Sequence, residues 1–207
     1  MIMKKAILFF AAAILLAFTA CTNDESVKFD GACDVGSVSH AGSWSLDSGI
    51  YTLTAAGLNL WAEKDAFYFV WKKVSGDFEF SGDFAFEGEG VNPHRKTGFM
   101  IRETLDADSR YADIALHGDG LTSLQYREAK GAETLEKSSE KTGPRSVSFR
   151  REGGKIIVRD GFGEIPAEDD IVLDIEFPEE CYVGMFLCSH EEDVVETAYV
   201  SNLKFKN

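Results

Sequence analysis

The sequence is poor in proline and cysteine, and it carries far fewer basic than acidic side chains. It has 4 Pro and 4 Cys among 207 residues, with 21 Lys and Arg against 35 Asp and Glu. The net charge of −14 argues against non-specific binding of nucleic acid, which depends on Lys and Arg at phosphates. It also disfavours adhesion of the folded chain to an anionic membrane surface. The 44% hydrophobic and 27% charged shares are those of a folded domain.

Several motifs of catalysis and metal binding are absent from the sequence. There is no Cys-x-x-Cys pair, zincin motif, Walker loop, dinucleotide fingerprint or Gly-x-Ser-x-Gly elbow. The alternating acids followed by Gly that mark a calcium loop are missing too. We therefore expect neither a cofactor nor a bound metal.

The one long apolar run lies at the N-terminus. Residues 6–20 follow Lys4 and Lys5, and they are too few to span a bilayer, which takes about 20 residues. They suit the core of a signal peptide, and the ending Leu-Ala-Phe-Thr-Ala-Cys21 resembles a bacterial lipobox. We expect residues 1–20 to be a lipoprotein signal peptide, and residues 21–28 to be the lipidated Cys21 and a polar tether. An ordinary secretory signal is the alternative.

A lipidated Cys21 implies a protein anchored in the bacterial envelope through its N-terminal lipid only. The acidic tether resembles that of surface-exported lipoproteins in Bacteroidetes-type bacteria, and it equally fits a plain spacer. Both the periplasmic and the cell-surface face of the outer membrane stay open, and no oligomeric state is indicated. Cys33, Cys181 and Cys188 remain; the last two are seven apart, so on one strand they face opposite sides. Pairing of one with Cys33 and buried free thiols both stay open.

Apolar and polar residues alternate from about Phe29 to the C-terminus, with turn signals between the segments. This pattern is typical of a β-sandwich or barrel, and we find no convincing helix. We expect one all-β domain over residues 29–207. Residues 129–143 favour a turn of helix or a loop. The expected strands are residues 50–55, 57–61, 67–74, 77–87, 97–105, 111–117, 121–128, 147–152, 155–160, 182–189 and 197–206.

Two hairpins can be paired from the sequence. A two-residue turn at 75–76 sets Trp71 opposite Phe80 and makes one face of that pair an aromatic core face. The second hairpin turns at 118–120, as described next.

The turn at 118–120 sets Asp113 opposite Gln125 on a polar face whose reverse is core. Arg102, on the preceding strand, joins this face, and we expect Asp113 to hold it in place. The Arg, His, Gln, Asp and Tyr side chains of these strands are donors and acceptors that suit hydroxyl-rich ligands. An exposed face of salt bridges is the alternative.

Several strings resemble one known family, the concanavalin A-like jelly-roll module of unknown function, which also occurs attached to TolB-like proteins in Bacteroidetes-type bacteria. The resemblance covers most of residues 29–206 and implies a two-sheet antiparallel jelly-roll sandwich. It implies no proven activity, because this fold hosts lectins, glycosidases and structural modules. The strings include Gly57-Leu-Asn-Leu-Trp61, Asn92-Pro-His-Arg-Lys96, His117-Gly-Asp-Gly-Leu121, Leu124-Gln-Tyr-Arg127 and Gly184-Met-Phe-Leu-Cys-Ser-His190.

Trp61 alternates with Leu58 and Leu60 and so can present one open face to a sugar ring; packing of its side chain against the fold is the alternative. Arg95 and Lys96 form a small basic island that can clamp a sugar or carboxylate; alternatively, His94 and Arg95 anchor their own loop. No residue is assigned a catalytic role. The candidate ligand-binding residues are Trp61, His94, Arg95, Arg102, Asp113, His117, Gln125 and Arg127.

The sequence favours a non-catalytic, lectin-like envelope lipoprotein whose partner is a carbohydrate or a glycan-bearing molecule. Two alternatives stay open. One is a sugar-active hydrolase on the same face, which would depend on Asp113, His117 or Glu103. The usual pattern of carboxylates on one strand is incomplete, because Val172 stands two residues before Asp174. The other is a protein-interaction module of an envelope complex.

Overall fold

A computed structural model describes residues 26–139, 146–161 and 170–207. The predicted signal peptide, Cys21 and the first residues of the tether lie outside these ranges. Within them, the regular structure consists of β-strands only. The described ranges hold no helix of sufficient length and apolar character to cross a membrane.

The strands form two antiparallel sheets, as the sequence predicted. The first sheet has the order β1-β5-β14-β7-β8-β9-β10, and β4 also pairs with β5. Its strands are β1 (Gly31–Val35), β4 (Asn59–Trp61), β5 (Lys64–Ser75), β7 (Lys96–Arg102), β8 (Tyr111–His117), β9 (Thr122–Arg127), β10 (Leu135–Ser138) and β14 (Glu180–Cys188).

The second sheet has the order β13-β12-β11-β6-β15-β3-β2. Its strands are β2 (Ser43–Asp47), β3 (Ile50–Gly57), β6 (Phe78–Phe86), β11 (Ser146–Glu152), β12 (Lys155–Asp160), β13 (Ile171–Asp174) and β15 (Glu191–Lys206).

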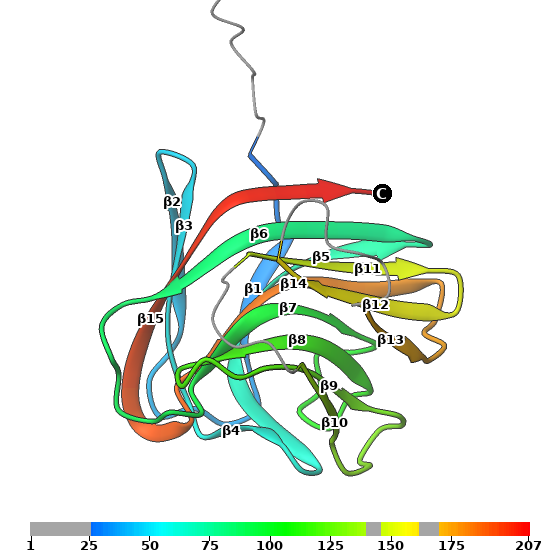
Figure 1. Cartoon of the computed structure of the whole chain (residues 1–207). Helices are drawn as coiled ribbons and strands as arrows, with labels where there is room; N and C mark the ends of the chain where they lie inside the picture. Colours follow the sequence, from blue (N-terminus) through cyan, green and yellow to red (C-terminus); the bar gives the residue numbers. More distant parts are fainter. Residues whose placement is uncertain (1–25, 140–145, 162–169) are drawn as a thin grey trace, which may run out of the picture.

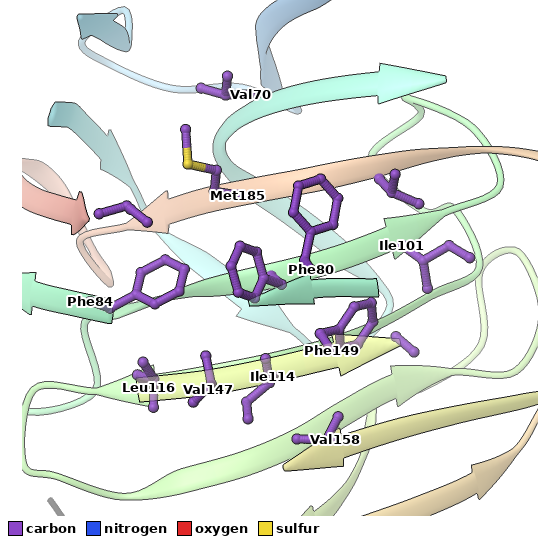
Figure 2. Packing of buried hydrophobic residues seen from close by; sticks show 14 of the residues in the cluster. Val70, Phe80, Phe84, Ile101, Ile114, Leu116, Val147, Phe149, Val158 and Met185 are labelled. Carbon is purple, nitrogen blue, oxygen red and sulfur yellow. The ribbon is translucent and has the colours of Figure 1, made fainter. Parts of the chain in front are cut away.

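The main core lies between the two sheets. Figure 2 shows Phe80 and Phe84 of β6 among side chains such as Ile114 of β8 and Met185 of β14. The rings of Phe80 and Phe84 lie 5.1 and 4.8 Å from that of Phe99, which comes from the opposite sheet. Alternate residues of each strand supply this core, which is why the period-2 pattern of the sequence identified most strands.

The outer face of the first sheet carries a second apolar cluster. Odd-numbered residues of β5 point there, whereas Tyr68 and Val70 point into the main core. Leu60 of β4 is fully buried in this cluster, so the hairpin of β4 and β5 lies over the outer face. Figure 1 shows this hairpin (cyan) on the side of β7 and β8 away from β6 and β15. The cluster comprises Val35, Leu60, Phe67, Phe69, Met100, Tyr111, Ala115, Phe186 and Cys188.

The register predicted for the second hairpin is confirmed, whereas the pairing predicted for the first hairpin is wrong. β8 and β9 pair with Asp113 opposite Gln125. β5 and β6, however, belong to different sheets, and residues 75–77 form the corner between them. Gly76 has φ +78° there, and its N–H donates to the carbonyl of residue 179 at 3.1 Å. Trp71 therefore packs on the outer cluster and not against Phe80. The prediction failed because β5 is apolar on both faces, so alternation does not reveal which face of the strand points into the main core.

Four strands were not predicted, namely β1, β2, β10 and β13. β2 and β10 are exposed along their whole length at sheet edges, so they carry no burial pattern. β10 lies inside the stretch 129–143 that was expected to be helix or loop, although residues 140–143 of that stretch lie outside the described ranges. The three described cysteines are free, and Cys181 and Cys188 lie in the main core and the outer cluster, on opposite faces of β14.

Candidate functional site

Arg102 and Arg127 meet Asp65 in a buried ionic cluster on the outer face of the first sheet. Arg102 Nη1 donates to Asp65 Oδ2 at 2.8 Å. Arg127 binds the same carboxylate through Nη2–Oδ1 at 2.8 Å and Nη1–Oδ2 at 3.0 Å. All three side chains are 0% exposed. The two guanidinium groups therefore bind groups inside the protein and are not accessible to a ligand.

The remaining donors of these arginines bind backbone carbonyls of the covering loops. Arg127 Nη2 donates to Ala62 O at 2.7 Å and Nε to Ala132 O at 2.9 Å, while Arg102 Nη2 donates to Asp106 O at 2.7 Å. The ring of Tyr111 lies about midway, 5.4 and 5.0 Å from the two guanidinium carbons. The cluster thus fixes the β4–β5 hairpin and two neighbouring loops onto the sheet.

The expected pairing of Asp113 with Arg102 is wrong. The register of β7 and β8 sets Asp113 opposite Met100, and Arg102 opposite Tyr111. Asp113 is fully buried; its Oδ1 accepts the Gln125 N–H at 3.3 Å, and its Oδ2 has no hydrogen-bond partner among the described residues. Burial raises the pKa of Asp113 well above its ordinary value. The sequence could not fix this register, because the length of the loop before β8 left it open by a residue or two.

Arg95 anchors its own loop, which is the alternative that the sequence left open. It is 2% exposed and forms an ion pair with Glu196 at 2.5 Å. Its Nη2 donates to Gly88 O at 2.6 Å, and its guanidinium lies 4.3 Å from the centre of the Phe86 ring. The side chain therefore connects the loop before β7 to β15 and is not free to clamp a sugar.

The other four candidates, Trp61, His94, His117 and Gln125, line one pocket of about 340 Å³, which we call the Trp61 pocket. They come from β4, the loop before β7, the end of β8 and β9. The residues that line it are Trp61, His94, Lys96, His117, Leu121, Gln125, Glu136 and His190.

The candidate residues predicted from the sequence did not include Lys96, Glu136 and His190, although Lys96 was identified with Arg95 as the basic island. Lys96 and His190 also stand in the strings that carry the family resemblance. Glu136 could not be found from the sequence, because its strand was not predicted.

Trp61 supplies the open aromatic surface of the pocket. Its side chain is 37% exposed, whereas Leu60 beside it is fully buried, as the alternation predicted. Leu58, which was expected on the same side as Leu60, is 55% exposed. The Lys96 ammonium lies 5.7 Å from the centre of the Trp61 ring. Three imidazole rings also line the pocket: the ring centre of His94 lies 6.1 Å from that of His117 and 5.7 Å from that of His190, each pair edge to face.

A chain of hydrogen bonds fixes the polar floor of the pocket. Lys96, only 2% exposed, donates from Nζ to Leu60 O at 3.0 Å and to Gln125 Oε1 at 3.2 Å. Gln125 Nε2 donates onward to Glu136 Oε2 at 3.0 Å. Burial acts to raise the pKa of Glu136, but the hydrogen bonds that its carboxylate accepts from Gln125 and Ser138 hold this pKa below its ordinary value. Burial lowers the pKa of Lys96.

His117 is an acceptor toward the pocket. Its Nδ1 lies 3.2 Å from the carbonyl oxygen of Leu121, and a carbonyl only accepts, so Nδ1 carries the proton. Burial, and then the charge of Lys96, lowers the pKa of His117 to about 4. The ring is therefore neutral near pH 7, and Nε2 is left as an acceptor. Among the residues that the structure describes, no group of three His, Cys, Asp or Glu is placed to hold a metal ion.

Comparison with known proteins identifies the fold but no family. A scan against protein-family models and a search of curated proteins find no match. A functionally unknown protein from Saccharomyces cerevisiae aligns with a TM-score of 0.60 at 16% identity, over 84% of this chain and 95% of that one. The carbohydrate-binding module CBM66 from Bacillus subtilis aligns with a TM-score of 0.53 at 16% identity, over 86% and 97% of the two chains.

A family 7 alginate lyase, A1-II′, crystallised with a substrate, aligns with a TM-score of 0.55 at 10% identity, over 79% and 80% of the two chains. The fold is a concanavalin A-like jelly-roll sandwich. This jelly roll serves a sugar-binding module in one neighbour and a lyase in another, so the choice between binding and catalysis rests on the residues of the Trp61 pocket.

Proposed function

We propose that this protein binds a carbohydrate in the Trp61 pocket without transforming it. The observation that carries the proposal is an open indole face beside polar groups that the fold already holds in position. A sugar ring presents C–H groups on its face and hydroxyls around its edge, and the pocket matches both. Trp61 suits the face, while Lys96 as donor and His117 Nε2 as acceptor suit the hydroxyls.

The size of the pocket supports a small occupant. Its volume of about 340 Å³ lies near the lower end of the range for ligand pockets, roughly 300 to 1,000 Å³. We therefore expect one or two sugar rings to be bound, with the rest of a longer glycan outside. The carbohydrate-binding module among the structural neighbours is further support.

We also propose that a lipid on Cys21 anchors the protein in the bacterial envelope. The support is the sequence alone: the positive n-region, the apolar run and the lipobox-like ending. Mass spectrometry of the protein extracted from membranes tests this. The expected result is loss of residues 1–20 and a diacylated Cys21, with a Cys21→Ser variant that is neither cleaved nor lipidated.

A glycan array tests the carbohydrate proposal, with residues 22–207 as the soluble protein. We expect binding to a defined glycan and loss of that binding in Trp61→Ala. Trp44→Ala is the matched control, because Trp44 is also 37% exposed but lies on β2 of the second sheet. Absence of any bound glycan, or unchanged binding by Trp61→Ala, would overturn the proposal.

A sugar-active enzyme is the second candidate, and the alginate lyase with the same fold is the observation that favours it. Hydrolysis through two carboxylates has little support, since Glu136 is the one carboxylate among the described residues that line the pocket. Asp113 is buried beneath the surface, and Glu103 lies 3.8 Å from Arg110 in an ion pair. Incubation with any glycan that binds, followed by analysis of its chain length, separates binding from cleavage.

A further inference from the structure

The ammonium group of Lys96 is a buried cation without a counter-ion. Its side chain is 2% exposed, and both of its hydrogen bonds go to neutral oxygens, Leu60 O and Gln125 Oε1. Within the described ranges, no carboxylate forms an ion pair with it. Asp113 and Glu136 act on it only at longer range. Buried lysines are almost always paired, so this arrangement calls for a partner that the described residues do not supply.

The open side of Lys96 faces the Trp61 pocket. An ammonium group has three donors, and two of them are used, so one N–H is left for an occupant of the pocket that Lys96 lines. The other buried cations of this part of the fold each have an ion-pair partner: Arg102 and Arg127 share the carboxylate of Asp65, and Arg95 pairs with Glu196.

The nearby acid Glu136 cannot take the place of that partner. Its two oxygens accept from Gln125 at 3.0 Å and from Ser138 at 2.7 Å, and Gln125 stands between it and Lys96. Trp61, by contrast, lies close to the ammonium, which is over the indole ring and 5.7 Å from its centre. Because both side chains line the same pocket, a sugar in contact with Trp61 has Lys96 within reach of a carboxylate substituent.

We propose that the Trp61 pocket selects acidic sugars, and that Lys96 is the counter-ion of the sugar carboxylate. This inference rests on the proposed carbohydrate binding and names the substrate class. A carboxylate accepts the third hydrogen bond of Lys96 and also supplies the opposite charge, whereas a hydroxyl or an ester supplies only the acceptor. A neutral sugar leaves the buried charge uncompensated.

Calorimetric titration of the full-length protein in detergent tests the selectivity with matched ligands. The probes are trimers of galacturonic, glucuronic and mannuronic acid, each beside its fully methyl-esterified form, which keeps the hydroxyls and removes the charge. For at least one sugar we expect the acid to bind about tenfold or more tightly than the ester. An ester that binds as tightly as its acid in every pair overturns the acidic selectivity and leaves carbohydrate binding intact.

The variant Lys96→Met tests whether the Lys96 ammonium causes the selectivity, because Met keeps the length of the aliphatic side chain and removes the charge. We expect the acid to bind this variant no better than its ester, with a melting temperature equal to or above that of the parent protein, since an unpaired buried charge is lost. Lys73→Met is the control: it changes the net charge equally at a surface ion pair with Glu180. Retained preference in Lys96→Met contradicts the assignment. If no probe binds and the glycan array is also empty, the proposed function fails together with this inference.

Discussion

Arg127 and Asp65 are joined by two parallel hydrogen bonds, Nη2–Oδ1 at 2.8 Å and Nη1–Oδ2 at 3.0 Å, in a pair with no solvent exposure. Asp65 stands near the start of β5, four residues after Trp61, and Arg127 ends β9. The pair, completed by Arg102, holds the hairpin of Trp61 against the sheet. The rigidity of the candidate sugar platform therefore depends on a carboxylate that never meets the ligand.

We expect Asp65→Asn to lower the free energy of unfolding by about 3–5 kcal/mol, because two buried guanidinium groups lose their counter-ion. Urea unfolding followed by circular dichroism measures this. Asp47→Asn, at an exposed position of β2, is the control and should change stability by less than about 0.5 kcal/mol. A loss below 1 kcal/mol in Asp65→Asn would show that the cluster contributes little to the fold.

Arg95→Ala separates loop anchoring from ligand binding. It leaves Glu196, only 6% exposed, without its partner, so we expect a loss of about 2–4 kcal/mol in unfolding free energy. Lys130→Ala removes an exposed ion pair with Asp106 and should cost at most about 1 kcal/mol. If Arg95→Ala abolishes glycan binding while its stability is unchanged, Arg95 contacts the ligand and the anchoring role is wrong.

The stability of the protein should fall as the pH drops from about 6.5 toward 4. The pKa of His117 is about 4 in the folded state, below its ordinary value of 6.5, so the unfolded chain takes up this proton first. The contribution of the neutral His117 ring to the free energy of unfolding is complete above pH 6.5 and is lost progressively below it. The loss amounts to about 2–3 kcal/mol at pH 4. Lys96, Asp119 and Glu136 are the charged groups that act on the ring, and burial lowers the pKa of His190 in the same direction.

Urea unfolding at pH 7.0 and pH 4.5 measures this effect in the parent protein and in His117→Gln. The variant should lose less stability between the two pH values, because it no longer has this histidine to protonate. His40→Gln, on an exposed loop, is the control. Equal pH dependence in the parent and His117→Gln would show that the ring is not held neutral.

The three described thiols should differ in reactivity. Burial raises the pKa of both Cys181 and Cys188 to about 11, so almost no thiolate forms at neutral pH. Cys33 is only partly buried and should react first with iodoacetamide. Peptide mass mapping over time in native protein gives the order, and urea-unfolded protein, in which all three should react alike, is the control. Early labelling of Cys188 would contradict the outer cluster.

Much of the fold was predictable because its signals are local. Alternation identified most strands, and the short turn at 118–120 fixed the register of Asp113 with Gln125, since a short turn leaves little freedom in pairing. The same argument failed at 75–76. There, the chain leaves one sheet for the other, and neither turn length nor alternation distinguishes a hairpin from a corner when one of the two strands, β5, is buried on both faces.

By itself, the sequence determined the class of fold and the strands that carry the polar face, and four of its eight candidate residues line the Trp61 pocket. The orientation of Trp61 opposite to Leu60 was predictable because alternation is a property of one short segment, whereas the choice between packing and an open face was not. Only the tertiary structure decided which charges are paired. Asp65 lies 37 residues from Arg102 and 62 from Arg127, so their pairing depends on how the β4–β5 hairpin folds over the sheet. That contact follows from burial of the outer apolar cluster, which no local spacing encodes, and it leaves Lys96 as the unpaired cation at the pocket.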